Sequence, residues 1–233
     1  MNKESNTYTF IFTIVMVTVV AFGLSFTSLM LKPVQEKNIM VEKKQNILAS
    51  LNKEVSFAEA DKVFDKYIKK MYIITPDGKY EEGNAFDIDL KEELHKPKQE
   101  RKMPLFIAEV DGKKYFVIPM YGKGLWGPIW GYMALSDDMN TIVGISFGHK
   151  TETPGLGAEI VKPKFRKQFA GKKIFDKNGT LIGIKVEKNL KIHNEHQVDA
   201  VSGATLTSKG VEAMISNTLE NYVEFFKNYK KTK

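Results

Sequence analysis

The chain has 233 residues, which is enough for a membrane segment and one sizeable domain but not for two large domains. Its net charge of +7 comes with lysines spread along the sequence rather than gathered in a block, as is typical of a solvated surface. Nucleic-acid binding is disfavoured, because the sequence has no zinc-finger spacing, helix-turn-helix signature or arginine-rich helix. Cysteine is absent, which excludes disulfides, thiolate nucleophiles and cysteine-ligated iron–sulfur clusters on this chain. Any redox chemistry would therefore need an organic cofactor or a metal held by a partner.

An uncharged, strongly apolar segment runs from Tyr8 to Leu31, after a short tail of residues 1–7. About 20 apolar residues are needed to cross the hydrocarbon core of a bilayer, so the segment is long enough to span it. A signal peptide would have a shorter apolar core and a small-x-small cleavage site, and neither is evident between Ala21 and Ser28. The sequence predicts an uncleaved transmembrane helix over residues 8–31.

Charge counting around this segment does not fix its orientation. One lysine precedes the segment and four follow it closely: Lys3, then Lys32, Lys37, Lys43 and Lys44. The positive-inside rule would keep the large domain in the cytoplasm, but long domains translocate largely regardless of charge. The residues alone leave the side of the membrane open.

Residues 32–100 are predicted to form a helical linker and the N-terminal part of the soluble domain. Apolar residues among Glu, Lys, Gln and Asn indicate a helix from beyond Pro33 to Leu51. A second helix is predicted from Ser56 to Lys70, with the Ser56 side chain as its N-cap.

Two further segments complete this region. Met71 to Thr75 is predicted to be a short strand that ends at the turn Pro76-Asp77-Gly78. The polar segment from Lys91 to Lys102 is predicted to be a loop or a loose helix without chemistry of its own.

Residues 101–233 change to a strand pattern. Leu105 to Val110 and Lys114 to Met120 flank Asp111-Gly112, which is a strong hairpin signal. The other predicted strands are Ile129 to Leu135, Thr141 to Phe147 and Leu181 to Val186. This order predicts an α+β domain with a mainly antiparallel sheet and flanking helices.

A glycine-rich loop from Gly122 to Gly127 matches the G-x-G-x-x-G pattern of dinucleotide sites. Such a fingerprint should open a helix, whereas here Pro128 and a strand-like run follow, which argues against a Rossmann site. The loop is predicted to lie beside a bound ligand instead, with Lys123 and Trp126 as candidate contacts. The Trp126 ring would then serve as an aromatic wall, the alternative being an ordinary core or surface tryptophan.

A second candidate loop runs from His149 to Gly157, after a predicted strand. Pro154 fixes φ, and the glycines at 155 and 157 free backbone amides to face a ligand. Taken alone, the segment is also consistent with a plain turn. His149 is assigned a structural role rather than proton transfer.

The third candidate is Asp199 to Ser208, which places four hydroxyls around two small residues. These are Ser202, Thr205, Thr207 and Ser208, around Gly203 and Ala204. An amphipathic helix is predicted to follow from Val211 to Tyr229, so the hydroxyls should lie at a helix N-terminus. Unpaired amides and the helix dipole favour a phosphate there, with Lys209 adding positive charge. The alternative is an ordinary Ser/Thr cap.

Metal binding is not predicted. His193 and His196 would share a helical face, but no acidic or cysteine partner lies at a persuasive spacing. A solvated loop is the simpler interpretation.

Ser202-Gly203-Ala204-Thr205, with Asp199 three residues ahead, resembles the flavinylation motif of the FMN-binding domain family. The resemblance implies that a separate flavin transferase joins FMN through its phosphate to the hydroxyl of Thr205. Ser202, Gly203, Ala204 and Thr207 would then surround the phosphate.

The two glycine-containing loops are also similar to elements of this family, namely Gly124-Leu125-Trp126 and Glu152-Thr153-Pro154-Gly155-Leu156-Gly157. The resemblance implies that Glu152, Thr153 and Leu156 approach the flavin ring system or ribityl chain. Backbone amides around Gly155 and Gly157 would serve its carbonyls, and residues 101–233 would form the FMN-binding domain.

The anchor, the two loops and the C-terminal motif, in this order, resemble the C-type subunits of sodium-translocating NADH:quinone reductases over nearly the whole chain. This implies an electron relay with covalent FMN and with neither an NADH site, a quinone site nor catalytic residues of its own. Electrons would arrive from an iron–sulfur subunit and pass to an FMN-carrying subunit. The family also implies a bacterial inner-membrane protein with its domain on the periplasmic side.

Two other interpretations stay open. The G subunit of the Rnf ferredoxin:NAD oxidoreductase shares the threonine-linked FMN, although the helical insert before residue 100 and the loop from Glu152 to Gly157 favour the sodium-pump family. A membrane-anchored binding or assembly protein without cofactor belongs to a different class. A yellow protein whose flavin survives denaturation would exclude it.

Overall fold

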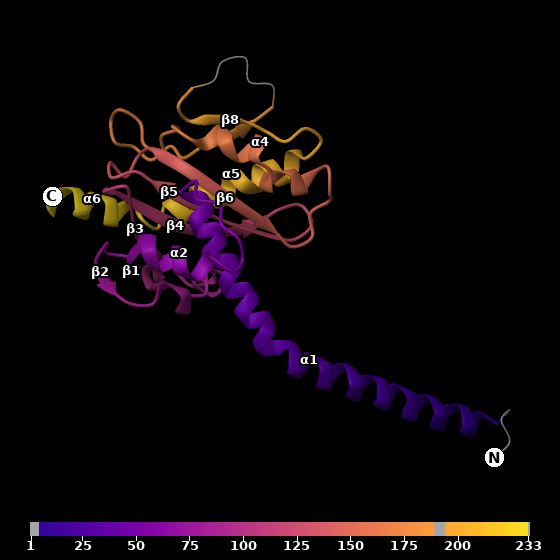
Figure 1. The fold of residues 1–233 in the computed structure, drawn as a ribbon. Helices are drawn as coiled ribbons and strands as arrows, with labels where there is room; N and C mark the ends of the chain where they lie inside the picture. Colours follow the sequence, from indigo (N-terminus) through magenta and orange to yellow (C-terminus); the bar gives the residue numbers. More distant parts are fainter. Residues whose placement is uncertain (1–4, 189–193, 233) are drawn as a thin grey trace. The chain divides into compact units, whose positions relative to one another are not determined.

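The computed structural model describes residues 5–188 and 194–232, with side chains up to residue 229, so Lys3 and His193 lie outside the described residues. The chain divides into two compact units, Met1–Lys43 and Lys44–Lys233 (Figure 1). The predicted domain boundaries at residues 31 and 100 stay a prediction.

Helix α1 (Asn6–Ser50) begins in the first unit and ends in the second. It is long and apolar enough to cross a membrane, and its most apolar stretch buries nothing against the protein. The two helical stretches that the sequence predicts on either side of Pro33 form one helix, with Pro33 in its interior. A proline removes a single N–H donor, and the rest of a 45-residue helix can tolerate this loss.

The second unit is built on a six-stranded sheet in the order β2-β1-β3-β4-β5-β6, and every neighbouring pair is antiparallel (Figure 1). The strands are β1 (Ile68–Ile74), β2 (Tyr80–Glu82), β3 (Met103–Val110), β4 (Lys113–Lys123), β5 (Pro128–Leu135) and β6 (Ile142–His149). The predicted α+β class with a mainly antiparallel sheet is confirmed. Both predicted hairpins are confirmed too, and Asp111 and Gly112 have the positive φ values, 52° and 73°, that a tight β3–β4 turn needs.

Both faces of this sheet are covered. Successive side chains of a strand point to opposite faces, so Leu105 and Ile107 pack in one core and Phe106 in the other. Helices α5 (Thr205–Leu219) and α6 (Val223–Thr232) contribute to the first core, and α2 (Ala60–Tyr67) and the last turn of α1 contribute to the second. Burial on both faces explains why the central strands have nearly continuous apolar sequences.

The predicted helix from Ser56 to Lys70 is wrong at both ends. Helix α2 covers only Ala60–Tyr67, and the Ser56 hydroxyl donates to the Glu59 carboxylate (2.7 Å) instead of capping the helix. Strand β1 begins at Ile68, earlier than predicted, because it pairs with Ala108 of β3. Sheet pairing here overrides the local helical pattern.

The predicted helix from Val211 to Tyr229 is also interrupted. Helix α5 ends at Leu219 and α6 begins at Val223, with a turn between them. Tyr222 in this turn is fully buried, and its hydroxyl donates to the Pro104 carbonyl of β3 (2.6 Å). Anchoring this side chain fixes the turn, although its apolar spacing is that of a continuous helix.

Shorter elements complete the unit. They are η1 (Ala85–Asp87), α3 (Leu90–His95), η2 (Lys98–Glu100), η3 (Gly157–Val161), α4 (Pro163–Arg166), η4 (Lys167–Phe169), β7 (Lys185–Glu187) and β8 (Gln197–Asp199). The predicted strand from Leu181 to Val186 is mostly wrong, because β7 starts only at Lys185 and pairs in parallel with β8. Leu181 forms an isolated bridge to Phe175.

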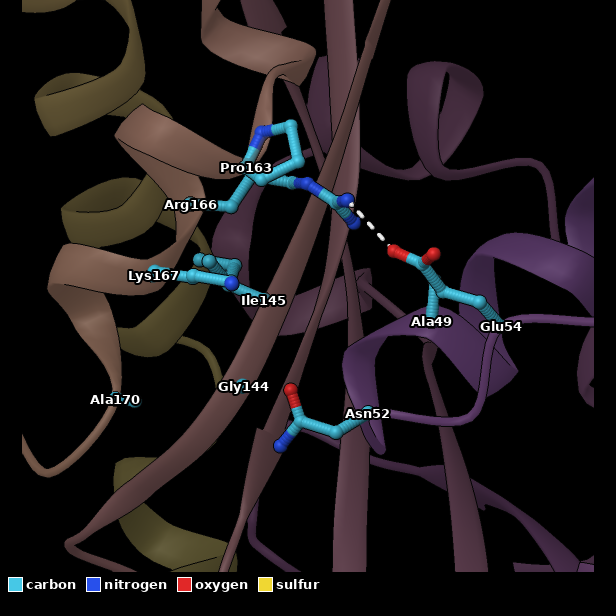
Figure 2. A pocket seen from close by; sticks show the side chains of 9 residues that line it. All are labelled: Ala49, Asn52, Glu54, Gly144, Ile145, Pro163, Arg166, Lys167 and Ala170. Carbon is cyan, nitrogen blue, oxygen red and sulfur yellow. Dashed lines mark hydrogen bonds and ion pairs between the residues drawn. The ribbon is translucent and has the colours of Figure 1, made fainter.

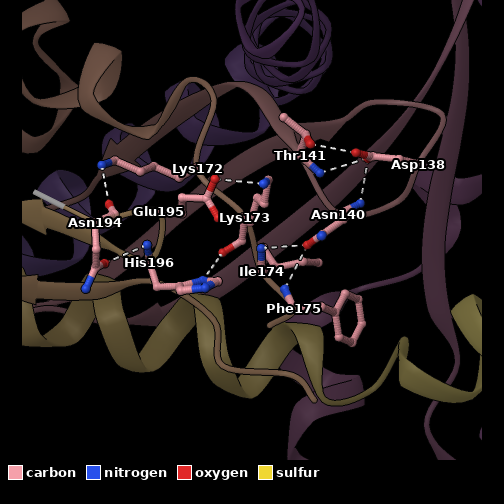
Figure 3. A network of polar contacts seen from close by, with 10 residues as sticks. All are labelled: Asp138, Asn140, Thr141, Lys172, Lys173, Ile174, Phe175, Asn194, Glu195 and His196. Atoms are coloured by element: carbon pink, nitrogen blue, oxygen red, sulfur yellow. Dashed lines mark hydrogen bonds and ion pairs between the residues drawn. The ribbon is translucent and has the colours of Figure 1, made fainter. Parts of the chain in front are cut away.

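A polar network ties the β7–β8 region to the main sheet (Figure 3). The Asn140 side chain, in the turn after β5, accepts hydrogen bonds from the amides of Ile174 and Phe175. On the other side, His196 Nδ1 lies 2.6 Å from the Lys173 carbonyl oxygen. His196 therefore has a structural role.

Glu93 of α3 is a buried carboxylate with two donors. It accepts hydrogen bonds from Lys96 Nζ (2.7 Å) and from the Lys102 amide (2.9 Å). Burial by itself would raise the pKa of Glu93, but these hydrogen bonds outweigh it, so the pKa lies below its ordinary value of 4.5.

We expect Glu93→Gln to lower the free energy of unfolding by about 1 to 3 kcal/mol near neutral pH. A carboxyl whose folded-state pKa is depressed stabilises the fold above its unfolded-state pKa, and this stability is lost as the pH falls through the folded-state pKa. The difference between wild type and variant should therefore shrink below pH 4.5. Urea titrations of the full-length protein in detergent measure it, and a difference independent of pH would contradict this account.

Candidate functional site

The N-terminus of α5 has no side-chain cap. The helix begins at Thr205, and Ala204 at the N-cap position offers no hydroxyl to its amides. The interpretation of the hydroxyl-rich segment as an ordinary Ser/Thr cap is therefore wrong. The first amides of a helix have no intrahelical partner, so this end of α5 presents N–H groups and the positive end of the helix dipole to an anion.

The four hydroxyls near this end differ in availability. Thr207 and Ser208 are each only 1% exposed. The Thr207 hydroxyl donates to a Glu152 carboxylate oxygen (2.6 Å), and Ser208 Oγ accepts from the Val201 amide (3.1 Å). Ser202 and Thr205 are exposed, so their hydroxyls are the two that another molecule can reach.

The loop between β4 and β5 lies beside this helix end. The Gly124 amide donates to the Gly127 carbonyl (2.8 Å) in a tight turn, and β5 follows directly at Pro128. A strand rather than a helix follows the loop, in agreement with the sequence pattern that argued against a dinucleotide fingerprint. A side chain at Gly210 of α5 would collide with the Lys123 carbonyl, so the helix backbone packs directly on the end of β4.

The loop after β6 reaches the same place. The Leu156 side chain lies over Gly203, where an added Cβ would come within 2.8 Å of Leu156 Cδ2. Gly157 and Glu152 are buried, whereas Thr153, Gly155 and Leu156 are exposed. The structure thus brings together all three segments that the sequence analysis singled out.

Exposed apolar side chains surround Thr205. Leu206 follows it directly and is 63% exposed, Trp126 is 66% exposed, and Leu125 and Leu156 are each 44% exposed. Such a group of exposed large side chains is uncommon on a free surface and is typical of a ligand or partner site. A flat apolar ring could pack on these residues.

Two hollows flank the site and carry positive charge. One, of about 700 Å³, is lined by Ser202, Gly155 and the lysines Lys162, Lys164 and Lys172. The other, of about 620 Å³, includes Lys123 and Arg101. Arg101 is held in place by bonds to the Lys96 and Leu94 carbonyls and to Asn221, so its position is structural.

The residues present fit FMN. The uncapped helix end suits its phosphate, the reachable Thr205 hydroxyl suits an ester bond, and the exposed Trp126 and Leu156 suit its ring. Lys209 is paired with Glu212 (2.9 Å), so its charge is partly neutralised by that carboxylate. Among residues 5–188 and 194–232, no cluster of His, Cys, Asp and Glu could hold a metal ion.

A separate cavity of about 430 Å³ lies between the end of α1, β6 and α4 (Figure 2). Arg166 at its wall pairs with Glu54 (3.2 Å), while its Nε atom is buried without a hydrogen-bond partner. Sequence reasoning missed this cavity, because Glu54 and Arg166 are 112 positions apart and no motif connects them. Sequence reasoning also missed that Thr207 and Glu152 bond to each other inside the domain.

Comparison with known proteins defines the class first. The FMN-binding domain family matches residues 124–220, which include both glycine-containing loops and the start of α5. The C subunit of the Na(+)-translocating NADH-quinone reductase of Haemophilus ducreyi is 30% identical over 91% of this chain and 88% of its own length. The equivalent protein of Pseudomonas aeruginosa is 30% identical over 99% of this chain and 98% of its own length.

Solved structures agree with these relatives. The crystal structure of the C subunit from Parabacteroides distasonis has a TM-score of 0.78 and 41% identity, covering 84% of this chain and 96% of that one. The NqrC structure from Shewanella oneidensis has a TM-score of 0.69 and 29% identity, covering 82% and 97%. The chain belongs to the NqrC family, the C subunits of Na(+)-translocating NADH-quinone reductases.

The close contact at Gly210 gives a stability prediction. Replacing glycine by alanine within a helix ordinarily stabilises it by up to about 1 kcal/mol. Here the added methyl would overlap the Lys123 carbonyl, and overpacking of this kind costs about 1 to 3 kcal/mol. We therefore expect Gly210→Ala to lower the unfolding free energy, measured by urea titration.

Asn217→Ala is the matched control, because Asn217 is exposed on the same helix. It should leave stability unchanged or raise it slightly. A Gly210→Ala protein as stable as Asn217→Ala would show that α5 does not need this close approach.

Proposed function

We propose that this chain carries FMN esterified through its phosphate to the Thr205 hydroxyl and relays electrons within a membrane-bound reductase. The observation that carries the proposal is the exposed Thr205 hydroxyl at the first residue of an uncapped helix. A phosphoester needs a reachable hydroxyl, a nearby anion site and no bulky neighbours, and this end of α5 offers all three.

Each part of the site has a role in this proposal. The amides and dipole of α5 hold the phosphate, with Ser202, Gly203 and Ala204 leaving room for it. Trp126, Leu156 and the loop residues Thr153, Gly155 and Gly157 pack against the ring or the ribityl chain. Lys123 lies at the rim. When bound, FMN supplies one- and two-electron redox chemistry at its ring.

No residue acts as a nucleophile or general acid in this account. A relay needs a cofactor that is fixed and close to its partners, and the covalent tether fixes it while the ring edge stays accessible. The chain has no NADH site of its own, which is consistent with the strand that follows its G-x-G-x-x-G loop.

The partners are proposed from the family. The relatives are subunits of a Na(+)-translocating NADH-quinone reductase, so electrons would come from an iron–sulfur subunit and leave to an FMN-carrying subunit. A flavin transferase would attach the FMN during maturation. The family assignment selects this role over an Rnf-type G subunit.

The location is proposed from α1 and from the family. Residues 8–31 would cross the bacterial inner membrane after a tail of residues 1–7. Residues 32–100 would form the linker and first part of the soluble domain, and residues 101–233 the FMN-binding domain, on the periplasmic side.

We expect Thr205→Val to abolish covalent flavin, because valine keeps the shape of threonine but has no hydroxyl. Intact-mass analysis and peptide mapping of protein made in its own host measure the attachment. Ser202→Ala, which removes the other reachable hydroxyl, is the control and should keep the flavin. In the assembled complex, Thr205→Val should stop electron flow to quinone but leave NADH oxidation by an artificial acceptor largely intact.

Flavin that persists on the Thr205→Val chain would refute the attachment site. A purified wild-type protein without bound flavin would favour the cofactor-free binding protein instead. If the isolated chain oxidised NADH at the rate of the complex, it would be a dehydrogenase rather than a relay.

The anchor gives an independent expectation. Alkaline extraction should leave the full-length chain in the membrane, and removal of residues 1–31 should release it, because the exposed apolar stretch of α1 is lost. Protease added to intact spheroplasts should digest the soluble domain. Complete protection of that domain, with digestion after lysis, would place it on the cytoplasmic side.

A further inference from the structure

We propose that Glu152 is a positioning residue whose buried carboxylate holds the Trp126 loop against the start of α5. It would thereby set where the Trp126 indole and the Thr205 hydroxyl lie relative to each other. This inference rests on the proposed function and differs from the role that the family resemblance implies for Glu152, which is contact with the flavin.

The Glu152 carboxylate bonds to two segments that are remote in sequence. Oε1 accepts from the Trp126 amide (2.8 Å), 26 positions away, and Oε2 accepts from the Thr207 hydroxyl (2.6 Å), 55 positions away. Glu152 is only 4% exposed. Since both oxygens are engaged and the side chain is enclosed, it acts through its neighbours and not by touching a ligand.

The glycines of both motif loops make room for this carboxylate. A Cβ at Gly124 would lie 2.5 Å from Glu152 Oε1, and a Cβ at Gly157 would overlap Oε2 and lie 2.7 Å from Thr207 Oγ1. The Gly-Leu-Trp loop and the loop that ends at Gly157 are thus built around one side chain. Space for this carboxylate explains glycine at both positions.

The charge on Glu152 is held without a cation. Among residues 5–188 and 194–232, no Lys, Arg or His forms an ion pair with it. A buried charge needs compensation. Two hydrogen bonds and the positive end of α5, where Thr207 lies in the first turn, supply it.

This charge has a consequence for the cofactor site. Reduction adds negative charge to a flavin, and a fixed negative charge nearby opposes it through the low dielectric of the interior. Removing the charge while keeping the hydrogen bonds should therefore make the flavin easier to reduce. Removing the whole side chain should in addition release the Trp126 loop.

The test compares Glu152→Gln with Glu152→Ala in the full-length protein. A Trp130→Phe background leaves Trp126 as the one tryptophan, since the chain has two. Glu93→Gln is the matched control, because Glu93 is also a buried, hydrogen-bonded carboxylate but lies on α3. The readouts are Trp126 fluorescence anisotropy in flavin-free protein, the fraction of chains with covalent flavin, and the flavin reduction potential.

Glu152→Ala should lower the Trp126 anisotropy and reduce flavin attachment several-fold. Glu152→Gln should keep both near wild type, because its amide can accept from the Trp126 N–H and donate to Thr207, yet its flavin potential should shift to less negative values. Glu93→Gln should change none of the three.

The proposal is overturned if Glu152→Ala matches wild type in anisotropy and attachment, if Glu93→Gln reproduces its effects, or if Glu152→Gln leaves the potential unchanged. The anisotropy is measured without flavin. If wild-type protein carried no flavin on Thr205, the proposed function would fail while the anisotropy still decided whether Glu152 holds the loop.

Discussion

The direct packing of α5 on the end of β4 is the constraint on which the site depends. Gly210 lets the helix backbone lie against the Lys123 carbonyl, and four buried side chains continue the contact toward the other end of the helix: Val211, Met214, Ile215 and Leu219. The helix therefore has its N-terminus at the tip of the β4–β5 hairpin. That hairpin lies in the middle of the sheet, between β3 and β6, so its loop has a more rigid base than an edge strand would give.

The same end of the helix leaves its polar groups for a ligand. Proteins usually satisfy the first amides of a helix with a side-chain cap. Here Ala204 stands at the N-cap position, and the nearby hydroxyls of Thr207 and Ser208 are directed to Glu152 and to the Val201 amide. The site is therefore polar where a phosphate would bind and apolar around it, at Leu206, Leu156 and Trp126.

The sequence by itself determined the anchor segment, the α+β class, both hairpins and the three motif loops. These rest on local patterns: a long uncharged run, alternating strands, Asp-Gly turns, and small residues next to hydroxyls. Element ends were less predictable. The start of β1 at Ile68 depends on pairing with β3, and the break between α5 and α6 depends on Tyr222 reaching the Pro104 carbonyl.

Only the tertiary structure decided which hydroxyls near residue 205 are available and what Glu152 does. In the sequence, Thr205 and Thr207 are both threonines beside a helix start, and Glu152 is one acidic residue in a loop. Burial and hydrogen bonding separate them, because Thr207 points into the domain toward Glu152 while Thr205 faces outward. These partners are 55 positions apart, and a contact of that range arises from the packing of α5 on the sheet, which no local sequence pattern encodes.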